Sequence, residues 1–267
     1  MIVSTRRFGR LGNELFQYAA VIGYAHKHGI AWSIPNRSSD PIWNPIHFPH
    51  LYRNEWVEGK EDVLLNEVWT ASQQYQEIPY RKEWGDAAQI VLNGYWQSYK
   101  YYDHCKEIVY KAFDYPWKLN KGVCSIHVRR GDYLLYPTKH PVVTIEYLQF
   151  AIRMISHYKK ITRFKFFSDD IPWCITCGIN LEFPDCQFEY STGKSETEDL
   201  IEMSCCEHNI ISNSTMSWWA AELNQNPGKV IVVPQKENWF GPDNKLSVKD
   251  LYRQGWVEVP YTPAYKL

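Results

Sequence analysis

Apolar residues along this chain fall alternately into short continuous runs and longer stretches with helical spacing. Residues 1–4 form a short apolar run that predicts a buried strand, and a glycine-containing loop at 6–13 follows it. From 14 to 28 apolar side chains recur at the spacing of one helix face, and Gly29 is a typical stop signal. An apolar run at 30–34 predicts the next strand, which completes a β-α-β unit.

A second alternating series starts near Gly122, after an aperiodic segment at 35–60 that predicts an ordered irregular loop and an aromatic stretch at 99–115. Strands are predicted at 123–128, 163–167, 209–212 and 229–233, and helices at 144–158, 196–205 and 216–223. This alternation predicts an α/β fold with parallel sheets. The predicted boundaries are 1–117 for a first domain, 118–245 for a second, and 246–267 for a tail that packs back on the first domain.

The charge balance argues against one large class of partners. Of the 267 residues 22% are charged, and the formal net charge is −1. Proteins that bind nucleic acids need a basic excess to displace counterions, so we expect no nucleic-acid partner. A small anionic ligand held by a few arginines is compatible with this balance. Aromatic residues make up 16% of the chain; most belong to the core, and some can line a sugar site, because a flat ring packs on the C–H face of a pyranose.

Cysteine usage and the first residues bear on the cellular compartment. The seven cysteines are odd in number and the chain is large, which argues against a disulfide framework. Cys174 and Cys177 form a lone C-x-x-C that lacks the second pair of a structural zinc site, so we expect reduced thiols. Polar residues follow the first apolar run at once, and we therefore expect neither a signal peptide nor a membrane anchor, and a cytoplasmic location.

Polar segments follow four of the predicted strands. They lie at 6–13, 127–132, 168–170 and 213–215. In open parallel sheets, ligands bind beyond the carboxyl ends of the strands. One such segment carries little weight, but four at successive strand ends predict a ligand site.

The segment 127–132 is the strongest of the four. A guanidinium group binds phosphate oxygens in a planar fork and stays charged. Adjacent side chains on an extended segment point opposite ways, so one arginine can face the ligand while the other holds a carboxylate as a structural brace; if Arg129 faces the ligand, Asp132 braces Arg130. A surface arginine pair without a role is the alternative. We favour function because His127 shares the strand side of Arg129.

Two further strand ends offer contacts for a nucleotide. The segment 213–215 starts a predicted helix, whose first N–H groups attract phosphate; simple N-capping explains the same residues and does not exclude this function. Asp169 or Asp170 can accept hydrogen bonds from N1–H and the N2 amino group of guanine, with a plain turn as the alternative. The loop at 9–13 lets the backbone approach a ligand closely, but it lacks the G-x-G-x-x-G spacing of a nicotinamide cofactor site.

Four segments carry a family resemblance. They are GRLGNELFQYA at 9–19, HVRRGD at 127–132, FSDDIPWC at 167–174 and CEHNIISNSTMSWWAA at 206–221. In this order they resemble the signature blocks of the α1,2-fucosyltransferases, glycosyltransferase family 11, and the similarity covers most of the chain. There is one departure: the family usually has Gln at the position of Glu14, and a carboxylate there would change contacts near the donor sugar.

The resemblance implies a GT-B fold, in which two Rossmann-like domains face each other across a cleft and GDP-fucose binds mainly to the C-terminal domain. It also implies inversion of the anomeric centre without a metal ion, and the sequence accordingly has no D-x-D motif. The candidate donor-binding residues are Arg10, Asn13, His127, Arg129, Asp169, Asn213, Ser214 and Thr215, with Arg129 on the β-phosphate. The candidate catalytic residues are Arg129 and a base, Asp132 or Glu14, that accepts the proton of the acceptor hydroxyl.

These residues are compatible with three functions. The leading hypothesis is inverting transfer of L-fucose from GDP-fucose to the 2-hydroxyl of a galactose in a bacterial-type surface glycan precursor. The alternative is a transferase that uses a different GDP-sugar or acceptor on the same scaffold. A carbohydrate-binding module without catalysis is the third, and the paired arginines argue against it because neutral glycans do not call for them. The predicted partners are a GDP-sugar and a galactose-containing glycan, with no cofactor, no metal ion and no membrane span.

Metal removal is expected to leave activity intact. Because Arg129 and a helix N-terminus are expected to meet the phosphate charge, transferase assays in excess EDTA should run at the full rate of untreated protein. A loss of most activity that added Mg²⁺ or Mn²⁺ restores would contradict this expectation.

Overall fold

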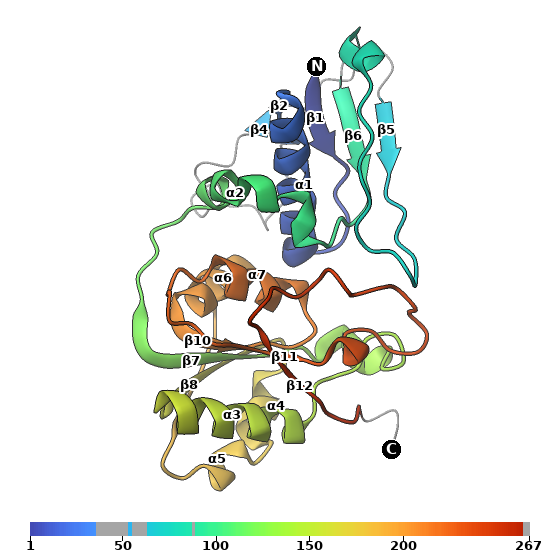
Figure 1. Ribbon diagram of the computed structural model, residues 1–267. Helices are drawn as coiled ribbons and strands as arrows, with labels where there is room; N and C mark the ends of the chain where they lie inside the picture. The colour runs from blue at the N-terminus through green and yellow to red at the C-terminus, as the bar shows by residue number, and fades with distance from the viewer. Residues whose placement is uncertain (36–52, 55–62, 87–88, 264–267) are drawn as a thin grey trace. The chain divides into compact units, whose positions relative to one another are not determined.

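The computed structural model describes residues 1–35, 53–54, 63–86 and 89–263 and divides into two compact units (Figure 1). The N-terminal unit comprises Met1–Pro116 with Lys249–Leu251, and the C-terminal unit comprises Trp117–Val248 with Tyr252–Leu267. Each unit is built on a parallel sheet with helices, which confirms the predicted α/β fold with Rossmann-like domains. Most of the predicted loop at 35–60 lies outside the described residues.

The N-terminal unit has a four-stranded parallel sheet in the order β2-β1-β6-β5. Its strands are β1 (Ile2–Thr5), β2 (Ala31–Trp32), β5 (Val63–Asn66) and β6 (Gln89–Asn93), and a separate pair joins β3 (Ile34–Pro35) to β4 (Arg53–Asn54). Its helices are α1 (Leu11–His28), α2 (Lys106–Ala112) and the 3-10 turns η1 (Lys82–Asp86), η2 (Tyr99–Tyr101) and η3 (Asp103–Cys105). Helix α1 contacts β1 as well as α2, η2 and η3, which explains why nearly every side chain in its first four turns is buried.

Three glycines allow α1 to begin, pack and end as it does. Gly9 has φ +77° just before the helix, and Gly29 closes it in the left-handed conformation with φ +64°, which confirms the stop signal. Gly23 lies inside the helix, where an added Cβ would stand 2.1 Å from the carbonyl oxygen of Tyr101. The glycine therefore allows the η2–η3 segment to lie directly against the helix backbone.

The C-terminal unit has a six-stranded parallel sheet in the order β12-β11-β10-β7-β8-β9. Its strands are β7 (Asn120–Val128), β8 (Arg163–Ser168), β9 (Gln187–Tyr190), β10 (Cys206–Ile210), β11 (Ile231–Pro234) and β12 (Val257–Val259). Its helices are α3 (Ile145–Lys159), α4 (Ile171–Thr176), α5 (Ile179–Glu182), α6 (Glu196–Cys205) and α7 (Thr215–Leu223), with η4 (Gly131–Leu135) and η5 (Lys236–Asn238). Helices α3, α4 and α5 lie on one face of the sheet, and α6 and α7 on the other (Figure 1). In the described ranges no helix combines the length and apolarity needed to cross a membrane.

The strands that the sequence predicted in this unit are the buried central ones. In β7 the last six residues are all buried, and Ile126 pairs with Phe166 of β8 and with Ile210 of β10. Continuous apolar runs of this kind are typical of parallel strands covered on both faces. The sequence did not predict β9 and β12, because they are short edge strands with alternating or partial burial.

The C-terminal tail is divided between the two units. Only Lys249–Leu251 group with the N-terminal unit, where the Asp250 carboxylate pairs with Lys100 and its backbone N–H donates to Gln74 Oε1 at 2.7 Å. From Tyr252 onward the tail belongs to the C-terminal unit, and β12 pairs with β11. The tail therefore extends the second sheet, since Val259 of β12 and Tyr261 after it belong to its core.

Candidate active site

The candidate site is built at the carboxyl ends of β7 and β10, the central neighbours of the C-terminal sheet. The strand order reverses between these two strands, because β8 and β9 follow on one side and β11 and β12 on the other. Open α/β sheets bind ligands at such a reversal. β7 continues into the arginine pair, and β10 continues into 212–214 and then α7. Two of the polar segments predicted from sequence therefore lie at adjacent strand ends.

The third segment, at the end of β8, supplies the carboxylates that hold the arginines. Arg129 Nη1 lies 2.8 Å from Asp169 Oδ2, and its Nη2 pairs with Asp132. The other oxygen of Asp169 accepts the backbone N–H of Arg130 at 2.9 Å. A parallel register that pairs Val128 with Ser168 brings these residues together. Arg129 is thereby fixed between two carboxylates.

Arg130 is braced from a different side than the sequence predicted. Its Nε donates to Asp170 Oδ2 at 2.9 Å, and its guanidinium lies 4.1 Å from the ring centroid of Trp173. The hydrogen bond from Arg130 lowers the pKa of Asp170, and Asp170 also caps α4 by accepting the N–H of Trp173. The brace is therefore Asp170, whereas Asp132 pairs with Arg129, because η4 turns Asp132 back toward that arginine.

These contacts bear on the guanine contact predicted for Asp169 or Asp170. Both carboxylates are engaged by the arginine pair in this structure. A guanine ligand would have to share or displace those contacts. The guanine contact stays a prediction. In the structure, the two carboxylates hold the side chains of the arginine pair.

His127 lies inside the sheet rather than on its rim. Its side chain is buried, and its Nδ1 lies 2.8 Å from Ser212 Oγ at the end of β10. Burial first, and then the charge of Arg129, lowers the pKa of His127 to about 3. The ring is therefore neutral at physiological pH and links the two central strand ends by a hydrogen bond. Its predicted place beside the nucleotide stays a prediction.

The turn that leads into α7 combines a scaffold residue with a helix start. Asn213 is buried, and its Nδ2 donates to the carbonyl oxygens of Pro141 at 2.8 Å and Trp239 at 3.0 Å. Ser214 is the N-cap of α7, and within the described chain its side chain makes no capping hydrogen bond. Thr215 is the first residue of the helix. The first N–H groups of α7 are thus not capped by Ser214, which is compatible with an anion at this end.

Tyr133 joins the arginine segment to this turn, a role that the sequence analysis did not predict. Its hydroxyl donates to the carbonyl oxygen of Asn213 at 3.0 Å, and its ring stacks on His140 with centroids 4.9 Å apart. The guanidinium carbon of Arg129 lies 5.6 Å from the Tyr133 ring centroid. Its one mark in the sequence is that it directly follows the polar segment 127–132.

In the N-terminal unit, the structure gives Glu14 an ionic partner. Arg7 donates to both Glu14 oxygens, from Nη2 at 2.8 and 2.9 Å and from Nε at 3.0 Å, and both side chains are only 5% exposed. A carboxylate held in this way is structurally occupied. The sequence did not reveal Arg7 as its partner, because the pairing bridges the loop at 6–13 and is not a helical spacing. Whether Glu14 also acts as a base stays a prediction.

The two other candidates in this unit lie at the start of α1. Arg10 is an exposed N-cap residue whose carbonyl accepts the N–H groups of Asn13 at 2.9 Å and Glu14 at 3.0 Å. Asn13 Oδ1 accepts a hydrogen bond from Gln97 Nε2 at 2.9 Å. A Cβ on Gly9 would stand 2.1 Å from Asn13 Nδ2, so the glycine is needed for this close approach.

The chain is similar in sequence to known glycosyltransferases. The profile of Glycosyl transferase family 11 matches residues 2–260. The alpha-1,2-colitosyltransferase of Escherichia coli is 24% identical over 97% of this chain and 99% of its own length. The O-antigen biosynthesis glycosyltransferase WbnK of Escherichia coli is 36% identical, but that match spans 52% of this chain and 45% of WbnK. The galactoside 2-alpha-L-fucosyltransferase SEC1 of Bos taurus is 26% identical over 80% of this chain and 62% of its own length.

Solved structures give the same fold. The crystal structure of POFUT1 in complex with GDP superposes with a TM-score of 0.53 at 12% sequence identity. That match covers 87% of this chain and 97% of POFUT1. At this level of identity the likeness concerns the fold, which is of the GT-B type that the sequence resemblance implied.

Removing the charge of Glu14 should destabilise the protein before it reveals anything about catalysis. Glu14→Gln leaves Arg7 charged and buried without its full partner, so we expect a loss of about 3 kcal/mol in the free energy of unfolding. Denaturant unfolding measures it. Glu189→Gln is the matched control, because its pair with Arg163 is 45% and 46% exposed, and it should cost about 0–1 kcal/mol. Unchanged stability with lost turnover would instead favour a catalytic base.

Arg130 and Asp170 should behave as one structural pair. Arg130→Lys removes the hydrogen bond to Asp170 and the contact with Trp173, and should lower unfolding free energy by about 2 kcal/mol. Asp170→Asn should act in the same direction. A double-mutant cycle measured by thermal unfolding should show the two changes to be less than additive; simple additivity would argue that Arg130 has another partner.

Proposed function

The chain belongs to Glycosyl transferase family 11, and we propose that it transfers L-fucose from GDP-fucose, with inversion, to the 2-hydroxyl of a galactose in a glycan. The observation that carries this proposal is the guanidinium of Arg129, held between Asp132 and Asp169 after β7, while the chain leads from the neighbouring strand β10 into α7. The names of the relatives support it: SEC1 is a galactoside 2-alpha-L-fucosyltransferase, and POFUT1 was crystallised with GDP. The WbnK match spans about half of that protein and the SEC1 match about three-fifths. The donor and the acceptor named above are therefore part of the proposal.

Arg129 is assigned to the departing nucleotide. When the bond to the fucose carbon breaks, negative charge grows on the β-phosphate of GDP. A guanidinium that meets this charge lowers the barrier, because the contact is stronger in the transition state than in the ground state. The two carboxylates that flank Arg129 hold its position before substrate arrives, so little reorganisation is needed at the moment of reaction.

The helix start at Ser214 and Thr215 is assigned to the remaining phosphate charge. Backbone N–H groups at a helix N-terminus hold phosphate oxygens without a counter-ion. Together with Arg129 they replace the divalent cation that many nucleotide-sugar enzymes use. This is the reason for the expected insensitivity to chelators.

Of the two candidate bases, we favour Asp132. Its side chain is 46% exposed, whereas that of Glu14 is 5% exposed and bound through both oxygens to Arg7. An acceptor hydroxyl can reach an exposed carboxylate more easily. Asp132 also forms an ion pair with Arg129, the residue assigned to the β-phosphate. Proton transfer to Asp132 and departure of GDP would therefore both change the charge around Arg129.

A second candidate function differs only in the donor sugar. The alpha-1,2-colitosyltransferase aligns with nearly the whole chain, which favours a scaffold able to use a GDP-sugar other than GDP-fucose. The measurement that separates the candidates is GDP release from GDP-fucose and from GDP-colitose, each with and without a β-galactoside. Acceptor-dependent release from GDP-fucose alone supports the first proposal, and release from GDP-colitose alone supports the second. Release from neither overturns both.

Arg129→Lys is expected to cripple turnover while the protein stays folded. Loss of one well-placed electrostatic contact typically costs on the order of 10²–10³ in rate. Lysine keeps the charge but cannot offer two parallel donors, so kcat should fall by roughly 10²-fold and further in Arg129→Ala. The affinity for GDP should weaken less than kcat falls, because the helix start still binds phosphate.

Steady-state kinetics, GDP titration and melting temperature together test this expectation. Arg130→Lys is the control, since its main effect should be on melting temperature. A folded Arg129→Lys protein with kcat within a few-fold of the parent would end the proposed role of Arg129.

A further inference from the structure

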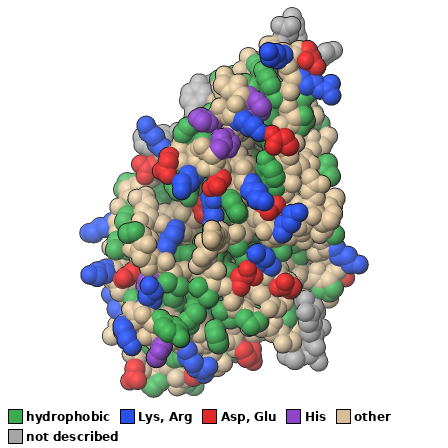
Figure 2. All heavy atoms as spheres, viewed as in Figure 1, with side chains coloured by type: hydrophobic (Ala, Val, Ile, Leu, Met, Phe, Trp, Pro, Cys, Tyr) green, Lys and Arg blue, Asp and Glu red, His purple; other side chains and the backbone are tan. Residues whose placement is uncertain are grey.

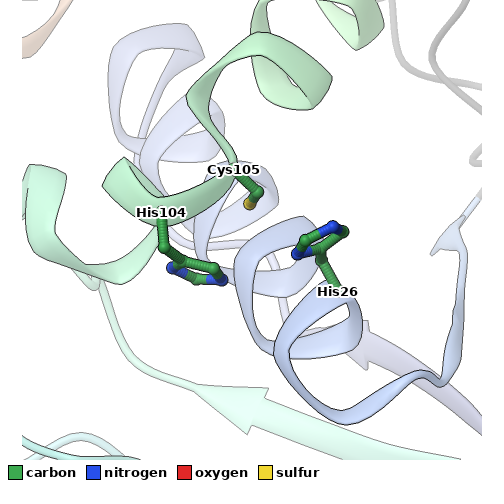
Figure 3. Close-up of side chains that lie close together, drawn as sticks. All are labelled: His26, His104 and Cys105. Atoms are coloured by element: carbon green, nitrogen blue, oxygen red, sulfur yellow. The ribbon is translucent and has the colours of Figure 1, made fainter.

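A group of nitrogen and sulfur ligands lies at the far end of α1. His26 belongs to the last turn of α1, and His104 and Cys105 belong to η3 (Figure 3). One ligand atom from each side chain lies within 4.8 Å of the other two, and the two imidazole centroids are 5.7 Å apart. Among the residues that the structure describes, this is the only group of three or more such side chains.

The backbone brings these residues together independently of any ion. Gly23 lets the η2–η3 segment lie against α1, and its carbonyl oxygen lies 3.1 Å from His104 Nε2. A backbone carbonyl is a common orienting partner for a metal-binding histidine. The ring of His104 is therefore held against the helix, with Cys105 next to it in the chain.

The chemistry of the three side chains is that of a zinc site. Two imidazoles and one thiolate suit zinc-class ions, whereas Mg²⁺ and Ca²⁺ prefer oxygen ligands. Bonds of about 2.0–2.3 Å in a tetrahedral arrangement place ligand atoms about 3.4–3.6 Å apart. Because the ligand atoms all lie within 4.8 Å of one another, the widest separation would have to close by at most about 1.4 Å, and the two histidines are exposed enough to turn.

The electrostatic surroundings also suit a cation. The group lies at the carboxyl end of an 18-residue helix, where the partial charge is negative. Figure 2 shows histidine side chains gathered with basic and acidic ones on this surface. Two of the lysines near the group are paired with carboxylates, Lys27 with Glu77 and Lys100 with Asp250.

Cys105 differs from the two histidines in its burial. It is 6% exposed, and burial raises the pKa of its thiol to about 11. A bound ion would therefore have to displace the thiol proton, which is released to solvent as the metal–sulfur bond forms. Burial also protects the sulfur from bulk oxidants.

We propose that His26, His104 and Cys105 bind one zinc-class ion that ties the end of α1 to η3. Three protein ligands leave a fourth position for water, beside a cavity of about 410 Å³ that Gly23, Tyr75 and His104 help to line. His26 lies thirteen residues beyond Asn13 on α1, which is about 20 Å along the helix. The ion would thus stabilise the N-terminal unit from a place remote from the donor-binding candidates, and it does not depend on the proposed transfer reaction.

Zinc titration of the full-length, chelator-stripped protein tests the proposal. Competition with a chromophoric chelator should give one ion per chain, and saturating Zn²⁺ should raise the melting temperature by about 5 °C at a hundredfold excess over Kd. Co²⁺ should produce thiolate-to-metal charge-transfer absorption. His26→Ala and His104→Ala should each weaken Zn²⁺ binding at least tenfold, and Cys105→Ser should abolish the Co²⁺ band.

Two controls separate this site from other thiols and imidazoles. His157→Ala removes an exposed histidine of α3, and Cys177→Ser removes one member of the C-x-x-C, whose thiol contacts the Cys174 carbonyl at 3.3 Å. Neither should change affinity, the band or the melting shift. Loss of binding in Cys177→Ser, or unchanged affinity in the double variant of His26 and His104, would overturn the proposal. Transferase activity plays no part in these readouts.

Discussion

Two arginines at the end of a buried parallel strand are a constraint that the rest of the candidate site satisfies. As neighbours directly after β7, Arg129 and Arg130 would repel each other, and neither can lose its charge. Asp169 and Asp170, which follow the neighbouring strand β8, each form an ion pair with one guanidinium group. The parallel register of the two strands places the four groups opposite one another. Asp132 of η4 and Trp173 of α4 contact the two guanidinium groups.

The same principle operates in the N-terminal unit with a different purpose. Arg7 and Glu14 form a pair that is almost fully removed from water, so each depends on the other for its charge to be tolerated. The pair fixes the loop before α1 to the first turn of the helix. Arg10 and Asn13 take their positions from that anchored loop. In both units, ion pairs that look like candidates for chemistry also serve to place their neighbours.

Much of the fold could be predicted from local patterns, and the pairings could not. The runs that became β7, β8 and α6 and the glycine that ends α1 were visible because burial and helix termination leave periodic or compositional marks. The strands β9 and β12 left weak marks because they lie at sheet edges. Several pairings depend on segments that tertiary structure brings together. They are the pairs of Arg129 with Asp132 and of Arg130 with Asp170, the Arg7–Glu14 pair and the contact of Tyr133 with Asn213. No spacing in the sequence encodes them.

The contacts of residues 249–259 affect the order in which the two units can complete their folding during synthesis. Asp250 supplies the partner of Lys100 and a contact to Gln74 in the N-terminal unit, and β12 then completes the edge of the second sheet. The first unit begins more than two hundred residues earlier, yet it lacks those contacts until Asp250 has been synthesised. A ribosome-bound intermediate without residues 249–259 would therefore carry two unfinished units at once, and removal of these residues would affect both. Fusion partners are better accepted after the last strand than within residues 249–259, where one short stretch serves both halves.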